Sequence, residues 1–210
     1  VDFPDAEIGF GHTRWATHGG VTKANAHPHL DCSGSIAVIH NGIIENYLDL
    51  HEGLSKKGIT FLSEPDTEIA AHLLDGFLKS GKKPLEALQA TCEQIRGSYA
   101  FLAIDESTPG TILVAKTATP IIIGIGDKES VVASDIPAVL PYTKRVLILE
   151  DGDIAEVKAS SIRILNDGKE VKRTEQIITW YPVTAQKGGF KHFMLKEIHE
   201  QVTSLTDTFR

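Results

Sequence analysis

The half of the sequence beyond residue 97 is divided into short apolar segments separated by turn residues, and this pattern limits the possible folds more than any other feature. Its apolar residues recur with a period of two, as in strands that bury one face. Asp151-Gly152 and Asn166-Asp167-Gly168 have the composition of tight hairpin turns. These features predict a long antiparallel meander. Its strands are expected at residues 99–105, 111–116, 121–126, 130–134, 146–149, 153–157, 161–165 and 170–173.

Helical spacing dominates the sequence before residue 97. Apolar residues three or four apart predict a helix at 43–57 that ends at Gly58, and another at 85–95. Between them lies a helix whose first turn contains Pro65 and Asp66. Helices followed by antiparallel strands predict an α+β fold with stacked layers, not a doubly wound parallel sheet.

Two short strands are expected near the helices. The first covers residues 8–13. The second covers residues 35–40 and is expected to stop at Asn41-Gly42, a pair that usually forms a turn.

The last part of the sequence predicts an amphipathic helix. Met194, Ile198, Val202, Leu205 and Phe209 recur three or four residues apart. We assign residues 1–187 to one domain, and residues 188–210 to a linker and helix whose apolar face must be covered by that domain or by another.

Charge and composition exclude several classes of partner. The formal net charge is −7 and the lysines and arginines do not cluster, which disfavours a nucleic-acid partner. No apolar run approaches the length needed to cross a bilayer. The two cysteines are far apart without a metal-binding spacing, which suits a reducing cytosol. We therefore expect a cytoplasmic protein without nucleic-acid or membrane partners.

Residues 11–29 contain four histidines within a short polar stretch. Their spacing matches neither a helical i, i+4 pair nor a knuckle with cysteine ligands, so no metal is expected and hydrogen bonding to loop backbone is the better explanation. The sequence also lacks the glycine-rich loops that hold phosphates or dinucleotides, and no cofactor is expected.

Three further features have two explanations each. An arginine fork such as Arg14 and a carboxylate such as Asp66 suit the α-carboxylate and α-ammonium of a free amino acid. From spacing alone, however, Arg14 is better explained as a surface residue and Asp66 as a helix cap. Asn41-Gly42 is better explained as a turn, although an amide beside a glycine N–H can also hold an oxyanion.

Taken together, several motifs resemble the glutaminase domain of the glucosamine-6-phosphate synthase family, the glutamine–fructose-6-phosphate aminotransferases. They occur in one order along nearly the whole chain, and "KHFMLKEIHEQ" (191–201) resembles the segment that leads into the sugar-isomerase half. The motifs are "HTRWATHG" (12–19), "NAHPH" (25–29), "HNGIIEN" (40–46), "SEPDTE" (63–68), "RGSYAF" (96–101) and "LEDGDIAE" (149–156).

The resemblance implies a fold and a site. The fold is the N-terminal-nucleophile hydrolase type, α+β, with antiparallel sheets stacked between helical layers. Asn41 and Gly42 would form the oxyanion hole, Arg14 would hold the glutamine α-carboxylate, and Asp66 its α-ammonium. The remaining residues implied at the substrate pocket are Trp15, Thr17, His18 and His27, and for His27 the implied role is either structural or binding.

The resemblance also implies an activity and partners. The domain would hydrolyse L-glutamine and supply ammonia for conversion of fructose 6-phosphate to glucosamine 6-phosphate in a sugar-isomerase domain of the same polypeptide, which would be a homodimer. The alternatives are the glutaminase domain of another amidotransferase, and a non-catalytic glutamine-binding or regulatory module.

The nucleophile is the main departure from the family pattern. In this family it is a cysteine at the mature N-terminus, whose own α-amino group acts as the base. The present sequence begins with Val1, and the internal Cys32 and Cys92 have no free α-amine. We therefore expect the N-terminal portion with the nucleophile to be missing, and this chain alone to be inactive as a glutaminase.

Overall fold

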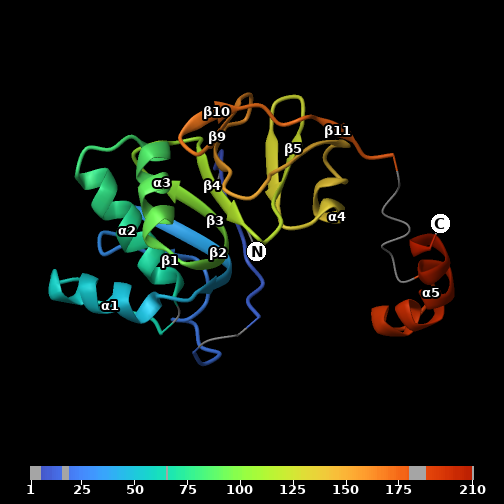
Figure 1. The fold of residues 1–210 in the computed structure, drawn as a ribbon, viewed down its shortest axis with the longest axis horizontal. Coiled ribbons are helices and arrows are strands. Elements are labelled where there is room, and N and C mark those ends of the chain that lie inside the picture. Colours follow the sequence, from blue (N-terminus) through green and yellow to red (C-terminus); the bar gives the residue numbers. More distant parts are fainter. Residues whose placement is uncertain (1–5, 16–18, 65, 180–187, 210) are drawn as a thin grey trace.

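The computed structural model describes residues 6–15, 19–64, 66–179 and 188–209. These residues form two antiparallel sheets (Figure 1). The larger sheet has seven strands among the described residues. In spatial order they are β1 (His29–Leu30), β2 (Ile36–Ile44), β3 (Gly97–Asp105), β4 (Ile112–Thr117), β8 (Ile154–Val157), β9 (Ile162–Asn166) and β10 (Lys169–Val171).

The smaller sheet packs on one face of the larger one. Within the described ranges it contains β11 (Gln176–Ile177), β7 (Arg145–Ile148), β5 (Ile122–Ile125) and β6 (Ser130–Ala133), in that order. Val114 and Ala155 of the larger sheet meet Ile123 and Leu147 of the smaller one in a buried apolar layer. A short helix, α4 (Ile136–Val139), packs with Ile122 and Val146 on the smaller sheet's other side.

Helices lie on the opposite face of the larger sheet: α2 (Thr67–Lys79) and α3 (Pro84–Gln94) pack on the strands, and α1 (Tyr47–Lys56) packs beside α2. Leu74 of α2 and Leu88 of α3 pack with Phe101 and Leu113 of the sheet, and all four are almost completely buried. The order of layers is therefore helices, seven-stranded sheet, four-stranded sheet and α4. The α+β prediction with stacked antiparallel sheets is confirmed.

The predicted elements of the second half are present, but their topology differs from one meander. Each strand predicted between residues 99 and 173 begins and ends within two residues of the observed strand. However, β4 pairs with β8 rather than β5, since the intervening strands leave to build the smaller sheet. The single-meander prediction is wrong because hairpin signals specify local pairs and not the sheet to which each pair belongs.

Strand β2 continues through the pair that was expected to end it. His40, Asn41 and Gly42 lie opposite Phe101, Ala100 and Tyr99 of β3, so Asn41-Gly42 is not a turn. The backbone of Gly42 has φ +129°, and a Cβ there would lie 2.0 Å from the carbonyl oxygen of Ser98. Glycine is thus required by this close approach rather than by a reversal of the chain.

Other sequence predictions near the N-terminus have mixed outcomes. The helix expected from residue 43 begins only at Tyr47, because Ile43 and Ile44 belong to β2. Residues 8–13 form no strand. The predicted end of the first helix is confirmed, with Gly58 at φ +88° directly after the last turn.

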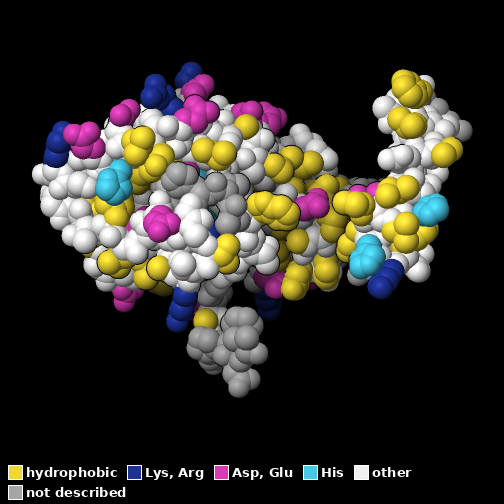
Figure 2. All heavy atoms as spheres, turned by 90° about the horizontal axis from the view of Figure 1, so that it is seen from below, with side chains coloured by type: hydrophobic (Ala, Val, Ile, Leu, Met, Phe, Trp, Pro, Cys, Tyr) yellow, Lys and Arg dark blue, Asp and Glu magenta, His cyan; other side chains and the backbone are white. Residues whose placement is uncertain are grey.

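The predicted C-terminal amphipathic helix is present as α5 (Phe193–Thr208), which lies apart from the sheets (Figure 1). Its apolar side chains are solvent-exposed, and Figure 2 shows them along the arm at the right. They include Met194, Ile198, Val202 and Leu205, with Phe209 following the helix. Among the described residues, no helix combines the length and apolar character needed to span a membrane.

Candidate active site

A cavity of about 190 Å³ opens beside the C-terminal half of β2. Strand β1 pairs with β2 only at Ala37 and Val38, so beyond them this edge of the sheet is free to border a site. Six of the eight predicted site residues line the cavity, whereas Thr17 and His18 lie outside the described residues. The six are Arg14, Trp15, His27, Asn41, Gly42 and Asp66.

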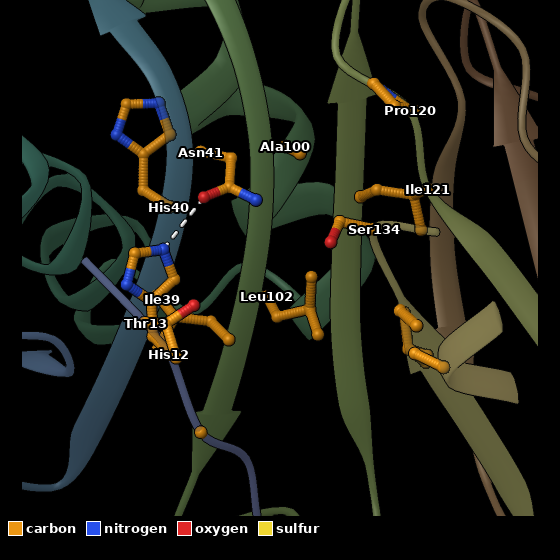
Figure 3. A pocket seen from close by; sticks show the side chains of 14 residues that line it. His12, Thr13, Ile39, His40, Asn41, Ala100, Leu102, Pro120, Ile121 and Ser134 are labelled. Carbon is orange, nitrogen blue, oxygen red and sulfur yellow. Dashed lines mark hydrogen bonds between the residues drawn. The ribbon is translucent and has the colours of Figure 1, made fainter. Parts of the chain in front are cut away.

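Asn41 lies where this cavity meets a second one, of about 290 Å³, between the two sheets. The Nε2 of His12 donates a hydrogen bond to Oδ1 of Asn41 at 2.8 Å. Figure 3 shows the amide nitrogen of Asn41 turned away from His12, toward the space between the sheets. His12 thus fixes the amide so that its N–H groups face the cavity. This function of His12 was not predicted, because nothing in its spacing distinguishes it from the neighbouring histidines.

The free edge of β2 presents alternate backbone N–H groups to the site. The N–H of His40 donates to Nδ1 of His27 at 3.2 Å, and that of Ile44 donates to Asp66 at 2.6 Å. In a strand, every second N–H points to the same side. The N–H of Gly42, midway between these two, is therefore directed at the same edge.

Asp66 precedes α2 but does not cap it. Its side chain accepts no hydrogen bond from the helix's first turn. Instead, Oδ2 accepts the N–H of Ile44, while Oδ1 lies 3.9 Å from Nδ1 of His40. The helix-cap explanation of Asp66 is wrong, because the carboxylate bridges to β2 and keeps acceptor capacity on the cavity side.

Arg14 and Trp15 form the outer wall of the cavity. Nη1 of Arg14 donates to the carbonyl oxygen of Gly20 at 2.9 Å. Gly20 is itself held by Glu64, which accepts the Gly20 N–H and a hydrogen bond from Asn25. Trp15 is 88% exposed, which places a large apolar side chain at the mouth of the cavity.

Two of the histidines at the cavity, His27 and His40, are neutral at pH 7. Burial, together with the positive potentials of His12, His29, His40 and Arg14, lowers the pKa of His27 to about 3. Burial lowers the pKa of His40 to about 4, although the charge of Asp66 opposes the change. His27 stacks on His12 with ring centroids 4.1 Å apart and so supports the residue that orients Asn41.

Neither cysteine of the chain lines either cavity. Cys32 lies in the turn between β1 and β2 and is exposed, whereas Cys92 lies on α3. Burial raises the pKa of the Cys92 thiol to about 12. Among the described residues, no three His, Cys, Asp or Glu side chains are grouped to hold a metal ion.

Comparison with known families identifies the domain. The family described as "Glutamine amidotransferase domain" matches residues 12–141, which is more than half of the chain. The chain belongs to this family. The matched residues include every residue that lines the cavity beside β2.

The amidotransferase domain is also similar to named proteins over nearly its whole length. It is 48% identical to the glutamine–fructose-6-phosphate aminotransferase (isomerizing) of Aquifex aeolicus, over 98% of the chain and 34% of that relative. Its identity to the enzyme of the same name from Caldanaerobacter subterraneus is 45%, over 100% of the chain and 34% of the relative. The chain thus spans about a third of the length of these relatives, and it corresponds to their glutaminase part.

Solved structures confirm the predicted fold type of the amidotransferase domain. Glutamine phosphoribosylpyrophosphate amidotransferase from B. subtilis, complexed with ADP and GMP, matches with a TM-score of 0.61 and 27% identity. A structure described as the allosteric regulatory enzyme of purine biosynthesis matches with a TM-score of 0.63 and 30% identity. Each match covers 74% of this chain and 34% of the other. The fold is therefore that of the N-terminal-nucleophile amidotransferases.

Proposed function

We propose that the cavity beside β2 binds L-glutamine and directs its side-chain amide toward Asn41 and Gly42. The observation that carries this proposal is the convergence of a guanidinium, a carboxylate, an amide and a strand-edge N–H on one cavity of about 190 Å³. The guanidinium and the carboxylate suit the charged α groups of glutamine, and the amide and the N–H suit its side-chain amide.

Arg14 and Asp66 bind the two charged groups of the ligand in this proposal. The guanidinium of Arg14 pairs with the α-carboxylate through charge-assisted hydrogen bonds. Asp66 accepts a hydrogen bond from the α-ammonium through Oδ1, because the Ile44 N–H donates to its other oxygen, Oδ2. Trp15, Thr17, His18 and His27 complete the pocket around the bound amino acid.

The other end of the ligand lies at the oxyanion donors. When a thiolate attacks the side-chain amide, negative charge develops on the amide oxygen and requires fixed donors nearby. Nδ2 of Asn41 and the N–H of Gly42 supply them, and the His12 hydrogen bond holds the Asn41 amide in place. Ammonia leaves as the carbonyl re-forms, and water then hydrolyses the thioester.

The thiolate itself must come from a cysteine at the cavity. Cys32 and Cys92 do not line it, and they are the two cysteines of the sequence. We therefore predict that this chain binds glutamine without hydrolysing it. Ammonia release measured with a coupled assay should equal the protein-free background, and release that disappears in the Cys32→Ser variant would overturn the prediction.

For the whole protein, we propose the activity named for the relatives. Residues 1–187 form the glutaminase domain, and residues 188–210 lead toward a sugar-isomerase domain that covers the apolar face of α5. The ammonia would convert fructose 6-phosphate to glucosamine 6-phosphate in a homodimeric, cytoplasmic enzyme. Identity of 43–48% to aminotransferases, against 27–30% to the two solved amidotransferase structures, favours this activity.

Binding to truncated ligands tests Arg14 and Asp66, the proposed partners of the two charged α groups, separately. Calorimetry with L-glutamine should give an affinity at least about tenfold weaker for Arg14→Ala and for Asp66→Asn than for the unchanged chain. Glutaric acid monoamide lacks the α-ammonium, and 4-aminobutyramide lacks the α-carboxylate. The affinity of glutaric acid monoamide should not change in Asp66→Asn, and the affinity of 4-aminobutyramide should not change in Arg14→Ala. The effects of removing a ligand group and of replacing its partner side chain are then non-additive.

The matched control is Arg145→Ala, which removes an exposed arginine paired with Glu175 at 2.6 Å, away from the cavity. Its glutamine affinity should equal that of the unchanged chain. Additive effects, or equal losses for both ligands in both variants, would rule out the proposed orientation of the amino acid.

The activity of the whole protein is tested on the polypeptide from its natural source, captured with an antibody to this chain. Its intact mass and N-terminal residue should show a chain about three times as long with an N-terminal cysteine. It should form glucosamine 6-phosphate from fructose 6-phosphate and glutamine. A natural chain of this length with glutamine affinity but no turnover would instead support a binding or regulatory module.

A further inference from the structure

A second set of chemically active side chains lies away from the amidotransferase cavity. Cys32 in the β1–β2 turn faces His72 on α2, with Sγ 3.8 Å from Nδ1. The other ring nitrogen of His72, Nε2, lies 3.3 Å from Oε1 of Glu68, one helical turn earlier. A thiol, an imidazole and a carboxylate are thus arranged in a row, the order found where a base activates a nucleophile.

Glu68 is held as a carboxylate. Burial by itself raises its pKa, but hydrogen bonds from the Ser63 hydroxyl, the N–H groups of Leu62 and Ser63, and His72 outweigh burial and lower the pKa overall. An ionised acceptor at Nε2 fixes the proton of His72 there, which leaves Nδ1 as an acceptor for the thiol proton.

A lysine and three acidic side chains also lie near this row. Lys79, one α2 turn beyond Asp75, is held by that carboxylate at 2.7 Å. The Lys79 ammonium interacts electrostatically with both Cys32 and Asp31. The acidic groups facing this region, Asp31, Glu68 and Asp75, each have donors of their own.

Cys32 is accessible, and the chain contains an internal reference for it. Cys32 is exposed to solvent, whereas Cys92 is half-buried against the core between the helices and the larger sheet, and no imidazole of the described residues contacts it. Phe61 packs edge-on against His72 with centroids 5.1 Å apart, which helps to hold the ring in place. The two cysteines therefore differ in access and in the base beside them.

We propose that Cys32, His72 and Glu68 form an activated thiol, and that Cys32 is a modification site for small uncharged electrophiles, with hydrogen peroxide as the oxidant class. The thiol proton moves to Nδ1 of His72, and Sγ attacks one peroxide oxygen. An S–O bond forms as the O–O bond breaks, and the leaving hydroxide takes the proton from His72 as water. Cys32 is oxidised to sulfenic acid, and peroxide is reduced.

The reactivity is measured with iodoacetamide on the full 210-residue chain, followed by peptide mass spectrometry at each cysteine. The comparison is the double variant Cys32→Ser, Ser160→Cys, which places an exposed thiol in the β8–β9 turn, where no sequence neighbour is a histidine. At pH 7, Cys32 should be alkylated at least about tenfold faster than the thiol introduced at position 160. Equal rates would overturn the proposal.

Two variants separate activation from exposure. His72→Gln should lower the alkylation rate of Cys32 about tenfold, and Glu68→Gln should lower it less. Circular dichroism identifies any variant that fails to fold. The pH–rate profiles of the unchanged chain and of His72→Gln then provide the independent test, since a base that takes the thiol proton should make the shape of the profile depend on His72. Parallel profiles would refute activation.

The oxidation step is tested with hydrogen peroxide and dimedone, which traps sulfenic acids. The dimedone adduct should form on Cys32 and not on Cys92 during brief treatment, and the His72→Gln variant should lose most of it. An adduct distributed equally over both cysteines would contradict the assignment.

Discussion

At the scale of single residues, Gly42 is the position where the smallest change should have the largest effect. A methyl group at Gly42 would meet the Ser98 carbonyl at 2.0 Å, and neither backbone can move without breaking the β2–β3 pairing. We expect Gly42→Ala to lower the free energy of unfolding by about 3 kcal/mol, measured by urea denaturation.

Gly34→Ala is the matched control for this variant. Gly34 also has a positive φ, +74°, but a Cβ there would meet nothing within 4 Å. Gly34→Ala should lower the free energy of unfolding by only about 1 kcal/mol, the cost of a side chain in the left-handed backbone region. Equal losses for the two variants would mean that the close approach to Ser98 is not what requires glycine at position 42.

The sequence predicted which residues gather at the cavity better than it predicted their local structure. Arg14, Asn41 and Asp66 were selected by chemistry and resemblance, and they line one cavity. The bonds they make could not be predicted, because they depend on partners far along the chain. Asp66 pairs with Ile44, and Asn41 with His12, which are 22 and 29 residues away.

At the scale of elements, α5 differs from the other helices in burying little apolar surface within the described residues. Its Met194, Ile198 and Val202 are 55–77% exposed. We expect deletion of residues 188–210 to change the free energy of unfolding of the sheets by less than about 0.5 kcal/mol. Urea denaturation followed by the tertiary signal measures this, and a larger loss would show that α5 packs on the domain.

Element prediction succeeded where local signals agree with long-range packing. Helix α2 was predicted from its apolar spacing, and Ile69, Ala70 and Leu74 are indeed buried. It failed at residues 41–44, where an Asn-Gly pair and helical spacing both suggested the end of a strand. Pairing with β3 overrode both signals, since Ile43 and Ile44 lie opposite Ser98 and Gly97.

At the scale of the whole molecule, the buried histidines make stability depend on pH. Folding lowers the pKa of His27 to about 3 and that of His40 to about 4, from an ordinary value of 6.5. Below pH 6.5 the unfolded chain therefore binds protons that the folded chain does not. We expect the urea midpoint to be constant above pH 7 and to fall progressively between pH 6.5 and 4.5.

Replacing one of these histidines tests the origin of the effect. His27→Gln should make the urea midpoint fall less steeply with decreasing pH, because the unfolded chain then has one fewer histidine that binds a proton more readily than in the folded chain. His199→Gln, at an exposed position on α5, should leave the slope of the decline unchanged. A slope that is the same in all three proteins would assign the acid sensitivity to other groups.

The arrangement of the two sheets was the part of the fold that the sequence could not predict. Strands and turns were evident from alternation, but the departure of β5, β6 and β7 to a second layer depends on which apolar faces meet. Ile123 and Leu147 could have packed in either sheet as judged by pattern alone. Only the resemblance to a known family specified two stacked sheets.

The alternation of β2 also limits how this domain can change length during evolution. Val38 and His40 face the helices, whereas Asn41 faces the smaller sheet, so neighbouring residues belong to different layers. Inserting or deleting one residue between Ile36 and Asn41 would exchange the two faces and turn the Asn41 side chain toward the helical core. Viable length variants should therefore be confined to the turn at residues 31–35, outside the ladder with β3.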